Sequence, residues 1–159
     1  MSSLTVRPAT NLDIDAVMAI TTESFGPVSF EKNIEDRYGL INGKTWVTRK
    51  SRHLESDFEH PEGVILVAEE SGVVIGYITL RLDKATGIGR IPNLAVQADS
   101  RNRGAGKQLI DKALEIMKSQ GMEIARIETL AQNEVGQYLY PQQGFEEVAR
   151  QIYYCCDLR

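Results

Sequence analysis

The sequence of 159 residues predicts an α/β fold with one mixed central sheet, antiparallel in its first part and parallel in its last, flanked by helices. Two apolar segments, 64–68 and 73–80, are separated by a short Glu-Ser-Gly turn, which is typical of antiparallel neighbours. A third apolar segment, 91–96, precedes a glycine-containing loop and a helix that ends near Gly121. The next strand, 124–131, must run parallel to its neighbour because a helix forms the crossover.

The earlier elements are predicted from local patterns. Residues 4–7 alternate in polarity and predict a short first strand, and Thr10 or Asn11 is a suitable cap for the helix that follows. A short helix is predicted to begin at residues 29–32 and to end near Gly39 or Gly43, and residues 46–58 predict another, ended by His-Pro-Glu-Gly. The latter helix carries a basic cluster, for which a solvated face is the expected role. Its members are Arg49, Lys50, Arg52 and His53.

After the parallel strand, residues 133–140 predict a short helix stopped by Pro-Gln-Gln-Gly, and two strands, over 145–149 and 151–156, are expected to end the chain. The last strand carries Tyr153 and Tyr154, which offer an apolar edge, so a homodimer is among the expectations. The adjacent cysteines that follow point to opposite faces of a strand and indicate neither a disulfide framework nor a zinc site.

Length and composition predict a single domain over residues 1–159. The formal charge of −4 argues against a nucleic-acid partner, which normally selects a basic face. No apolar run approaches the roughly 20 residues of a membrane span, and residues 1–5 lack the features of a secretion signal. With no disulfide framework expected, these features together predict a cytoplasmic protein without a membrane partner.

The loop Arg101-Asn102-Arg103-Gly104-Ala105-Gly106 has a chemical interpretation. Its glycines allow a sharp turn and the close approach of an anion, and the first-turn N–H groups of the following helix lack helical partners. Those groups carry roughly half a positive charge, so they attract phosphate, and the two arginines add donors suited to phosphate oxygens. An ordinary strand-to-helix turn on a basic surface is the alternative.

A dinucleotide-binding fold also places glycines between a strand and a helix. Here Leu109 stands where its third glycine would fall. An antiparallel pair also precedes the loop, where that fold repeats strand-helix units. Both features argue against this interpretation.

The loop resembles the Arg/Gln-x-x-Gly-x-Gly/Ala signature of the GNAT superfamily of N-acetyltransferases, which binds the pyrophosphate of acetyl-CoA. Residues 133–145 resemble that family's later motif, an Asn followed by a helix ending in Leu-Tyr and then Gly-Phe. The resemblance implies a GNAT-like fold and transfer of acetyl from acetyl-CoA to a primary amine by direct attack in a ternary complex, without a metal. The amine is a protein N-terminus, a lysine or a small amine. The alternative is a non-catalytic acyl-CoA-binding or sensing domain.

The resemblance also implies roles for single residues. Backbone groups of Leu94 and Val96 would pair with the pantetheine arm as though it were an added strand. Tyr140 would protonate the departing thiolate, unless it merely packs, and Asn133 would cap its helix, touch the cofactor, or both. The implied cofactor-binding set is Leu94, Ala95, Val96, Arg101, Asn102, Arg103, Gly104, Ala105, Gly106, Lys107, Asn133 and Tyr140.

The general base is implied less directly. Glu128 lies five residues before Asn133, a place that resembles the base position of the ribosomal-protein N-terminal acetyltransferases in this superfamily. An ion pair with Arg126, on the same strand face, is the alternative, and a water chain would serve where no side chain does. The sequence departs from the family pattern at Ala98, where proline is usual, and at Pro141, which follows Tyr140.

Overall fold

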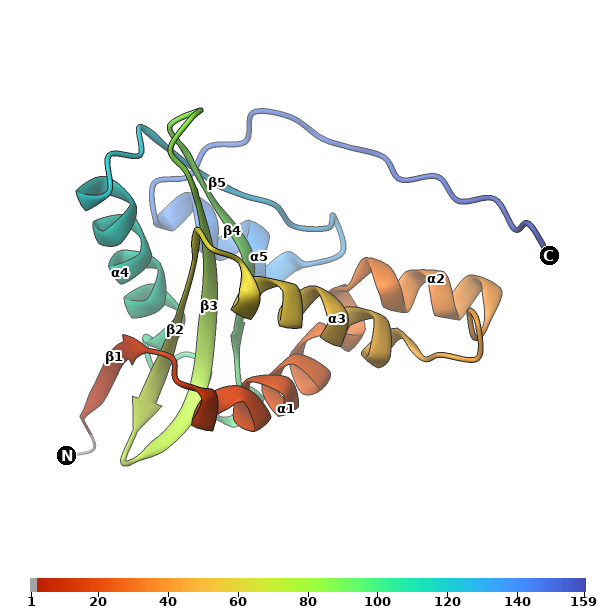
Figure 1. Cartoon of the computed structure of the whole chain (residues 1–159), viewed down its shortest axis with the longest axis horizontal. Helices are drawn as coiled ribbons and strands as arrows, with labels where there is room; N and C mark the ends of the chain where they lie inside the picture. Colours follow the sequence, from red (N-terminus) through yellow and green to blue (C-terminus); the bar gives the residue numbers. More distant parts are fainter. Residues whose placement is uncertain (1–2) are drawn as a thin grey trace.

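A computed structural model describes residues 3–159. Residues 1 and 2, which belong to the predicted domain and to the segment 1–5 that lacks a secretion signal's features, lie outside the described residues. A five-stranded sheet of order β1-β2-β3-β4-β5 forms the centre (Figure 1). Neighbours are antiparallel through β4, and β5 is parallel to β4, which confirms the predicted mixed sheet. The strands are β1 (Leu4–Pro8), β2 (Gly63–Glu70), β3 (Val73–Asp83), β4 (Ile88–Val96) and β5 (Ile124–Ile127).

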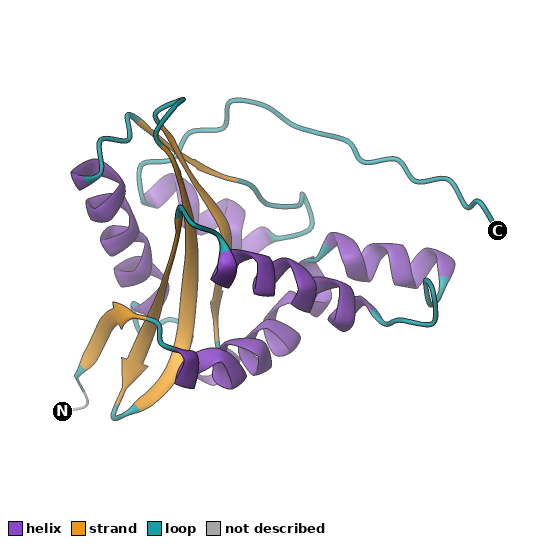
Figure 2. Cartoon of the chain, viewed as in Figure 1, coloured by secondary structure: helices purple, strands orange, loops and turns teal. Residues whose placement is uncertain are grey.

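Helices cover both faces of the sheet (Figure 2). On one face α4 and α5 pack against the strands, and on the other α1 and α3 do so, with α2 beyond them. The helices are α1 (Ile14–Phe25), α2 (Phe30–Tyr38), α3 (Trp46–Glu59), α4 (Ala105–Ser119) and α5 (Glu134–Gln142), with short 3-10 turns η1 (Asn11–Asp13), η2 (Gly26–Val28) and η3 (Ala98–Ser100). Within the described chain, no helix combines the length and the apolar character needed to span a bilayer.

The helical periodicity predicted after the glycine loop is confirmed. Leu109, Ile110, Ala113 and Met117 are buried against the sheet, and Gly121 ends the turn with a φ of 80°. Fully burying a leucine, isoleucine or methionine side chain contributes roughly 1.5–3 kcal/mol to the stability of the fold. The short turn between β2 and β3 is equally well predicted, since Ser71 and Gly72 both adopt the positive φ of a tight hairpin.

A bulge interrupts β4. Arg81 lies opposite Arg90 and Thr79 lies opposite Asn93, so two steps along β3 face three along β4. The extra residue changes the side-chain alternation: Ile91 packs under α4, whereas the Asn93 side chain contacts Asp57 of α3. Pro92 occupies the bulge, where the missing N–H of proline is tolerated.

Pairing between β4 and β5 stops at the same place. The last paired residues are Ile91 and Ile127, so β4 continues to Val96 without β5 beside it. The strand predicted over 124–131 is therefore too long at its end, because the chain turns away from β4 after Ile127. The two strands diverge, and an edge of β4 is open.

The two strands expected over 145–149 and 151–156 are not formed. Residues 145–159 carry no regular secondary structure, and in Figure 1 this segment leaves the sheet and runs past α2 to the C-terminus. Tyr153 stacks near Phe30 of α2, with ring centroids 4.7 Å apart, and the Tyr38 hydroxyl donates to the Cys155 carbonyl at 3.0 Å. The prediction fails because a strand needs a paired neighbour, and these contacts hold the segment on a helix instead.

Candidate active site

The open edge of β4 carries backbone groups that β5 does not pair. The Gln97 N–H donates to the Ile75 carbonyl of β3 at 2.8 Å. Because backbone groups alternate in direction along an antiparallel pair, those of Leu94 and Val96 face away from β3. Consistent with this, the Val96 carbonyl accepts from Ser24 Oγ at 3.3 Å and from Arg101 Nε at 3.2 Å. Within residues 3–159 no strand covers this edge, so an extended ligand can pair there.

The glycine loop lies directly after this edge. Gly104 is the N-terminal cap of α4 with a φ of 86°, and Asn102 is also left-handed at 62°. A Cβ at Gly104 would meet no atom within 4 Å, so the backbone conformation rather than crowding requires glycine there. Residues 101–104 are exposed, and the first-turn N–H groups of α4 provide about +0.5 of an elementary charge beside them.

The predicted phosphate ligands surround the loop, but their side chains already contact protein groups. Arg101 donates to the Val96 carbonyl, and Arg103 pairs with Glu70 at 3.2 Å. Lys107 pairs with Asp111 one turn further along α4 at 2.5 Å, whereas Ala105 is buried and contributes packing. Exposed ion pairs of this kind contribute about 0–1 kcal/mol, so a phosphate can replace them at little cost.

Helix α5 packs against the start of α4. A Cβ added at Gly106 would lie 3.6 Å from Leu139 Cδ2 and 3.9 Å from Val96 Cγ2. The end of β4, the glycine loop and α5 therefore meet in one region, although they are far apart in sequence. The fold thus brings together most of the residues predicted for cofactor binding.

Asn133 is the N-terminal cap of α5. Its Oδ1 accepts from the Gly136 N–H at 3.1 Å, and its Nδ2 donates to Thr129 Oγ1 at 2.8 Å. A Cβ at Gly136 would lie 2.7 Å from Asn133 Nδ2 and 3.0 Å from the Tyr140 ring, so a larger residue there would displace the Asn133 side chain from its capping position. The predicted capping role is confirmed, and contact with a cofactor stays a prediction.

Tyr140 lies in the last part of α5, which continues through Pro141 to Gln142. Its ring meets Phe145 edge-on, with centroids 6.2 Å apart. Burial raises the pKa of Tyr140 to about 12, so the phenol stays protonated at neutral pH. In the part of the chain that the structure describes, its hydroxyl makes no hydrogen bond, and it keeps a proton to donate.

Glu128 follows the end of β5 and is held by two arginines. One carboxylate oxygen lies 3.0 Å from Arg90 and the other 2.7 Å from Arg126. The ion pair foreseen with Arg126 is present, and Arg90 from β4 completes it. A carboxylate has about four lone-pair positions, so the two arginine contacts leave positions at which Glu128 could accept a proton. Its role as the general base stays a prediction.

A polar network behind the β4 bulge was not foreseen. Lys50 of α3 donates to Asn93 Oδ1 at 2.7 Å and lies over the Phe25 ring, 4.3 Å from its centroid. Asn93 Nδ2 donates to Asp57 at 2.7 Å, and Arg81 donates to the same carboxylate at 2.9 Å. Burial lowers the pKa of Lys50, against the opposing effect of nearby carboxylates.

The solvated face expected for the basic cluster is thus only partly correct. Arg52 and His53 are exposed, but Arg49 donates to backbone carbonyls of Glu31 and Lys44, and Lys50 points at the sheet. In the sequence, the polar network around Lys50 is indicated by Asn93, a polar residue inside an apolar strand segment, because a buried amide needs hydrogen-bond partners.

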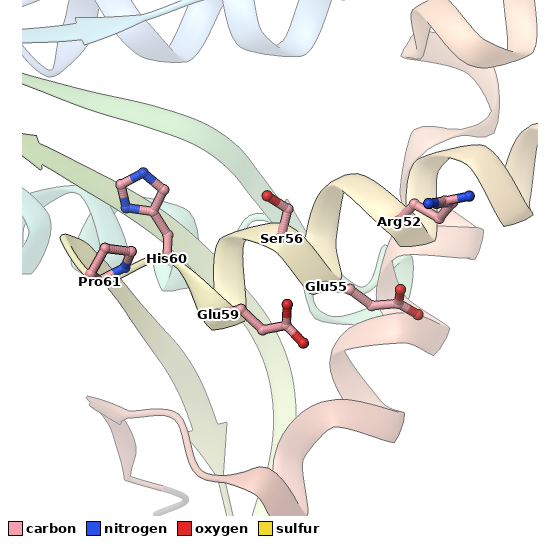
Figure 3. A pocket seen from close by; sticks show the side chains of 6 residues that line it. All are labelled: Arg52, Glu55, Ser56, Glu59, His60 and Pro61. Atoms are coloured by element: carbon pink, nitrogen blue, oxygen red, sulfur yellow. The ribbon is translucent and has the colours of Figure 1, made fainter.

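An open pocket of about 440 Å³ lies elsewhere, on the outer side of α3 (Figure 3). It shares no residue with β4, the glycine loop or α5, so it is not part of the candidate site. The lining residues are Arg52, Glu55, Ser56, Glu59, His60 and Pro61. No group of three or more His, Cys, Asp or Glu side chains able to hold a metal occurs among residues 3–159.

The site combines a strand edge that can pair with an extended ligand, a helix N-terminus that can bind an anion, and a protonated tyrosine. An acyl-CoA acyltransferase needs a site of this class. Residues 29–145 match the acetyltransferase (GNAT) family model. The chain belongs to the acetyltransferase (GNAT) family, and is thus an acetyl-CoA-dependent acyltransferase.

Individual relatives agree with this assignment. The chain is 31% identical over 109 residues to the uncharacterized N-acetyltransferase YhfO of Bacillus subtilis, covering 66% of this chain and 73% of that protein. Two solved structures share the fold. The aminoglycoside N-acetyltransferase AAC(6')-Iy in complex with CoA has a TM-score of 0.70 at 19% identity, covering 98% of this chain and 96% of that one. The PaiA N-acetyltransferase of Thermoplasma acidophilum in complex with coenzyme A has a TM-score of 0.72 at 21% identity, covering 91% and 90%.

Proposed function

We propose that this protein transfers acetyl from acetyl-CoA to a primary amine by direct attack in a ternary complex. The observation that carries the proposal is the open edge of β4 beyond Ile91, which adjoins both the glycine loop and α5. A thioester on a long extended arm with a pyrophosphate at its far end matches this arrangement. The acceptor is a protein N-terminus, a lysine or a small amine.

The cosubstrate would lie along residues already described. The pantetheine arm would pair with backbone groups of Leu94 and Val96 in the place of a sixth strand, next to Ala95. Its pyrophosphate would accept hydrogen bonds from the backbone of residues 101–106. Arg101, Arg103 and Lys107 would exchange their present partners for phosphate oxygens, and Asn102 would supply the left-handed turn.

The reaction forms a C–N bond, breaks the C–S bond and moves one proton from nitrogen to sulfur. Tyr140 would give its phenolic proton to the leaving thiolate and regain one from the attacking nitrogen or from solvent. With a pKa of about 12 the phenol is still protonated when the thiolate forms, so the proton that this role needs is present. Backbone N–H groups at the β4 edge would polarise the thioester carbonyl.

The attacking amine must first lose a proton, since an alkylammonium group has a pKa near 10. Glu128 would accept that proton directly or through a water. Its position at the point where β5 diverges from β4 supports this role, and its two arginine partners hold the carboxylate in place. A water chain alone is the alternative.

Thermal unfolding with acetyl-CoA, CoA and NAD tests the cofactor. A ligand at about 100 times its dissociation constant adds roughly 2.7 kcal/mol of stability. We expect shifts with acetyl-CoA and CoA but not with NAD; no shift with either acyl carrier would contradict the proposal. A non-catalytic acyl-CoA sensor is the second candidate. It predicts the same shifts but no acetylation across peptide, lysine and small-amine acceptors.

A further inference from the structure

Three arginines lie abreast on one face of the sheet, in the part where β3, β4 and β5 pair. Arg90 of β4 is opposite Arg81 on β3 and opposite Arg126 on β5. Their neighbours in the sequence pack in the core cluster under α4, namely Leu82, Ile91 and Ile127. Because side chains alternate along a strand, the three arginines lie on the other face, that of α1 and α3. Like charges opposed on adjacent strands destabilise a sheet, so this row needs anions beside it.

Two carboxylates accompany the row. Asp57 of α3 accepts from Arg81 Nε at 2.9 Å, which commits Arg81 to the helix. Glu128 is shared, since its two oxygens lie 3.0 Å from Arg90 and 2.7 Å from Arg126. The row of three guanidinium groups and two carboxylates therefore keeps an excess of positive charge, and the excess lies with Arg90 and Arg126.

These two arginines retain donors for a further anion. A guanidinium has five N–H donors, and among residues 3–159 no group other than Glu128 pairs with either side chain. The side chains of Arg90 and Arg126 are 47% and 58% exposed, so a small solute can reach them. Asp83 is the next carboxylate along β3, but it accepts from backbone N–H groups of its own turn. The unused donors thus face solvent beside Glu128.

The place of this arginine pair bears on which amines fit the site. Arg90 and Arg126 directly precede the last paired residues of β4 and β5, so they border the gap where the strands diverge. An amine that gives its proton to Glu128 lies about 2.6–3.2 Å from that carboxylate. With the arginines one contact further away, the same amine is on the order of 6 Å from both guanidinium groups. A group two or three bonds from the amine nitrogen can therefore reach them.

Charge then selects among acceptors. An alkylamine is mostly protonated at neutral pH, so it approaches the site as a cation. Two arginines that share one carboxylate repel a simple cation. An acceptor that carries its own carboxylate is neutral overall, and that carboxylate can take paired hydrogen bonds from a guanidinium.

We propose that Arg90 and Arg126 bind a carboxylate of the acceptor, and that the acceptor is a small amino acid rather than a protein lysine or a polyamine. This inference rests on the proposed transfer to an amine beside Glu128. The acceptor amine lies between Glu128 and the thioester at the β4 edge, and its carboxylate takes the N–H groups that Glu128 leaves unused. Arg81 stays with Asp57 and holds α3 on the sheet.

Amino acids paired with their amides test the proposal, because the members of each pair differ only at the carboxyl group. The common amino acids and the matching amides are each offered with acetyl-CoA, and kcat/KM is measured. We expect at least one acid to be preferred over its amide by about ten- to a hundredfold, as charge-assisted hydrogen bonds provide. The amide has the more readily deprotonated amine, so ionisation of the nucleophile favours the opposite order. Equal or greater activity with every amide would overturn the proposal.

Arg90→Gln and Arg126→Gln identify the source of that preference. Each should lower the acid-to-amide ratio of kcat/KM by about tenfold or more, mainly through the KM of the acid. Arg126→Lys keeps the charge without the paired donors and should recover only part of the ratio. If the arginines merely hold Glu128 in place, rates with acids and amides fall alike and the ratio persists, which would refute carboxylate binding. Arg150→Gln breaks an exposed ion pair with Glu147 and is the matched control.

Binding without turnover separates this inference from the proposed function. Calorimetry titrates the same amino acids into protein saturated with CoA, where no acetyl group can move, and the acetyl-CoA thermal shift checks that each variant is folded. Amino-acid binding that Arg90→Gln weakens, with no acetylation of any amine, would support the carboxylate site and contradict the transfer. Acetylation of amides, short peptides or diamines with no preference for acids would support the transfer and overturn the carboxylate site. If no amino acid is bound or acetylated, the carboxylate site is also refuted.

Discussion

Lys50 and Asn93 join the helical layer of α1 and α3 to the interrupted strand β4 through a hydrogen bond of 2.7 Å. Asn93 directly precedes Leu94, whose backbone faces the open edge. The same Asn93 amide donates to Asp57 and Thr79. Position 93 is thus fixed on three sides, which holds the neighbouring backbone in the geometry that an added strand requires.

Lys50→Met is therefore expected to destabilise the protein and to weaken acetyl-CoA binding. Removing the ammonium leaves the side-chain oxygen Oδ1 of Asn93 without its donor, which costs about 1–3 kcal/mol of the free energy of unfolding. Chemical denaturation and the KM for acetyl-CoA measure the two effects. Lys84→Met, on an exposed turn, is the matched control and should change stability by no more than about 0.5 kcal/mol.

Tyr140→Phe keeps the ring that packs on Phe145 and removes the hydroxyl. Loss of a general acid lowers turnover by about 100- to 10,000-fold, whereas the thermal shift with acetyl-CoA should persist. Because the pKa of Tyr140 is about 12, the wild-type rate should show no decline from its ionisation at pH values well below that. Tyr138→Phe, on an exposed side chain of the same helix, should leave turnover unchanged. Full activity in the Tyr140 variant would exclude the acid role.

Glu128→Gln distinguishes a side-chain base from a water chain. If the carboxylate accepts the proton of the amine, the variant loses the acidic limb of the kcat/KM profile and much of its rate. The fold should survive, since a partly exposed ion pair contributes little. Glu115→Gln breaks a comparable pair with Lys112 on α4 and controls for lost charge. An unchanged profile in Glu128→Gln would assign deprotonation to water.

Gly104→Ala and Gly121→Ala form a matched pair at the two ends of α4. The φ angle is 86° at Gly104 and 80° at Gly121, and a Cβ added at either position would meet no atom within 4 Å. Each substitution should cost about 1–2 kcal/mol through left-handed strain alone. Only Gly104→Ala should also raise the KM for acetyl-CoA, by roughly ten- to a hundredfold, if one phosphate hydrogen bond is lost. Equal KM values would argue against phosphate at the loop.

Asp13 predicts how the fold responds to acid. The Arg7 guanidinium and the Thr10 hydrogen bonds hold the pKa of Asp13 well below its ordinary value of 3.8. The unfolded chain binds a proton more readily, so this stabilisation is complete above about pH 4 and is lost as pH falls toward the folded pKa. Asp13→Asn should be less stable than wild type at pH 7, with the difference shrinking below pH 4. A constant difference between pH 7 and pH 2.5 would contradict this account.

Sequence patterns predicted most of the fold because the relevant signals are local. The period of Leu109, Ile110, Ala113 and Met117, and the turn at Ser71 and Gly72, each specify their own element. The glycine loop and the cap at Asn133 were likewise visible, since they depend on a few adjacent residues.

Long-range partners could not be predicted in this way. The sequence does not show that Lys50 meets Asn93, or that Arg90 of β4 joins Glu128, which follows β5. The C-terminal segment has strand propensity, yet whether a strand forms depends on which edge it reaches. In each case the missing information is which groups distant in sequence become neighbours.

Beyond the bulge at Ile91 and Pro92, β4 is intolerant of inserted residues. Because side chains alternate at every residue, one residue inserted after Asn93 would turn Leu94 toward the layer of α1 and α3, and Ala95 toward the apolar layer under α4. The edge that faces β5 would then present the backbone of the wrong residues. Homologous chains can therefore vary side chains in this stretch, but insertions after Asn93 should be eliminated by selection.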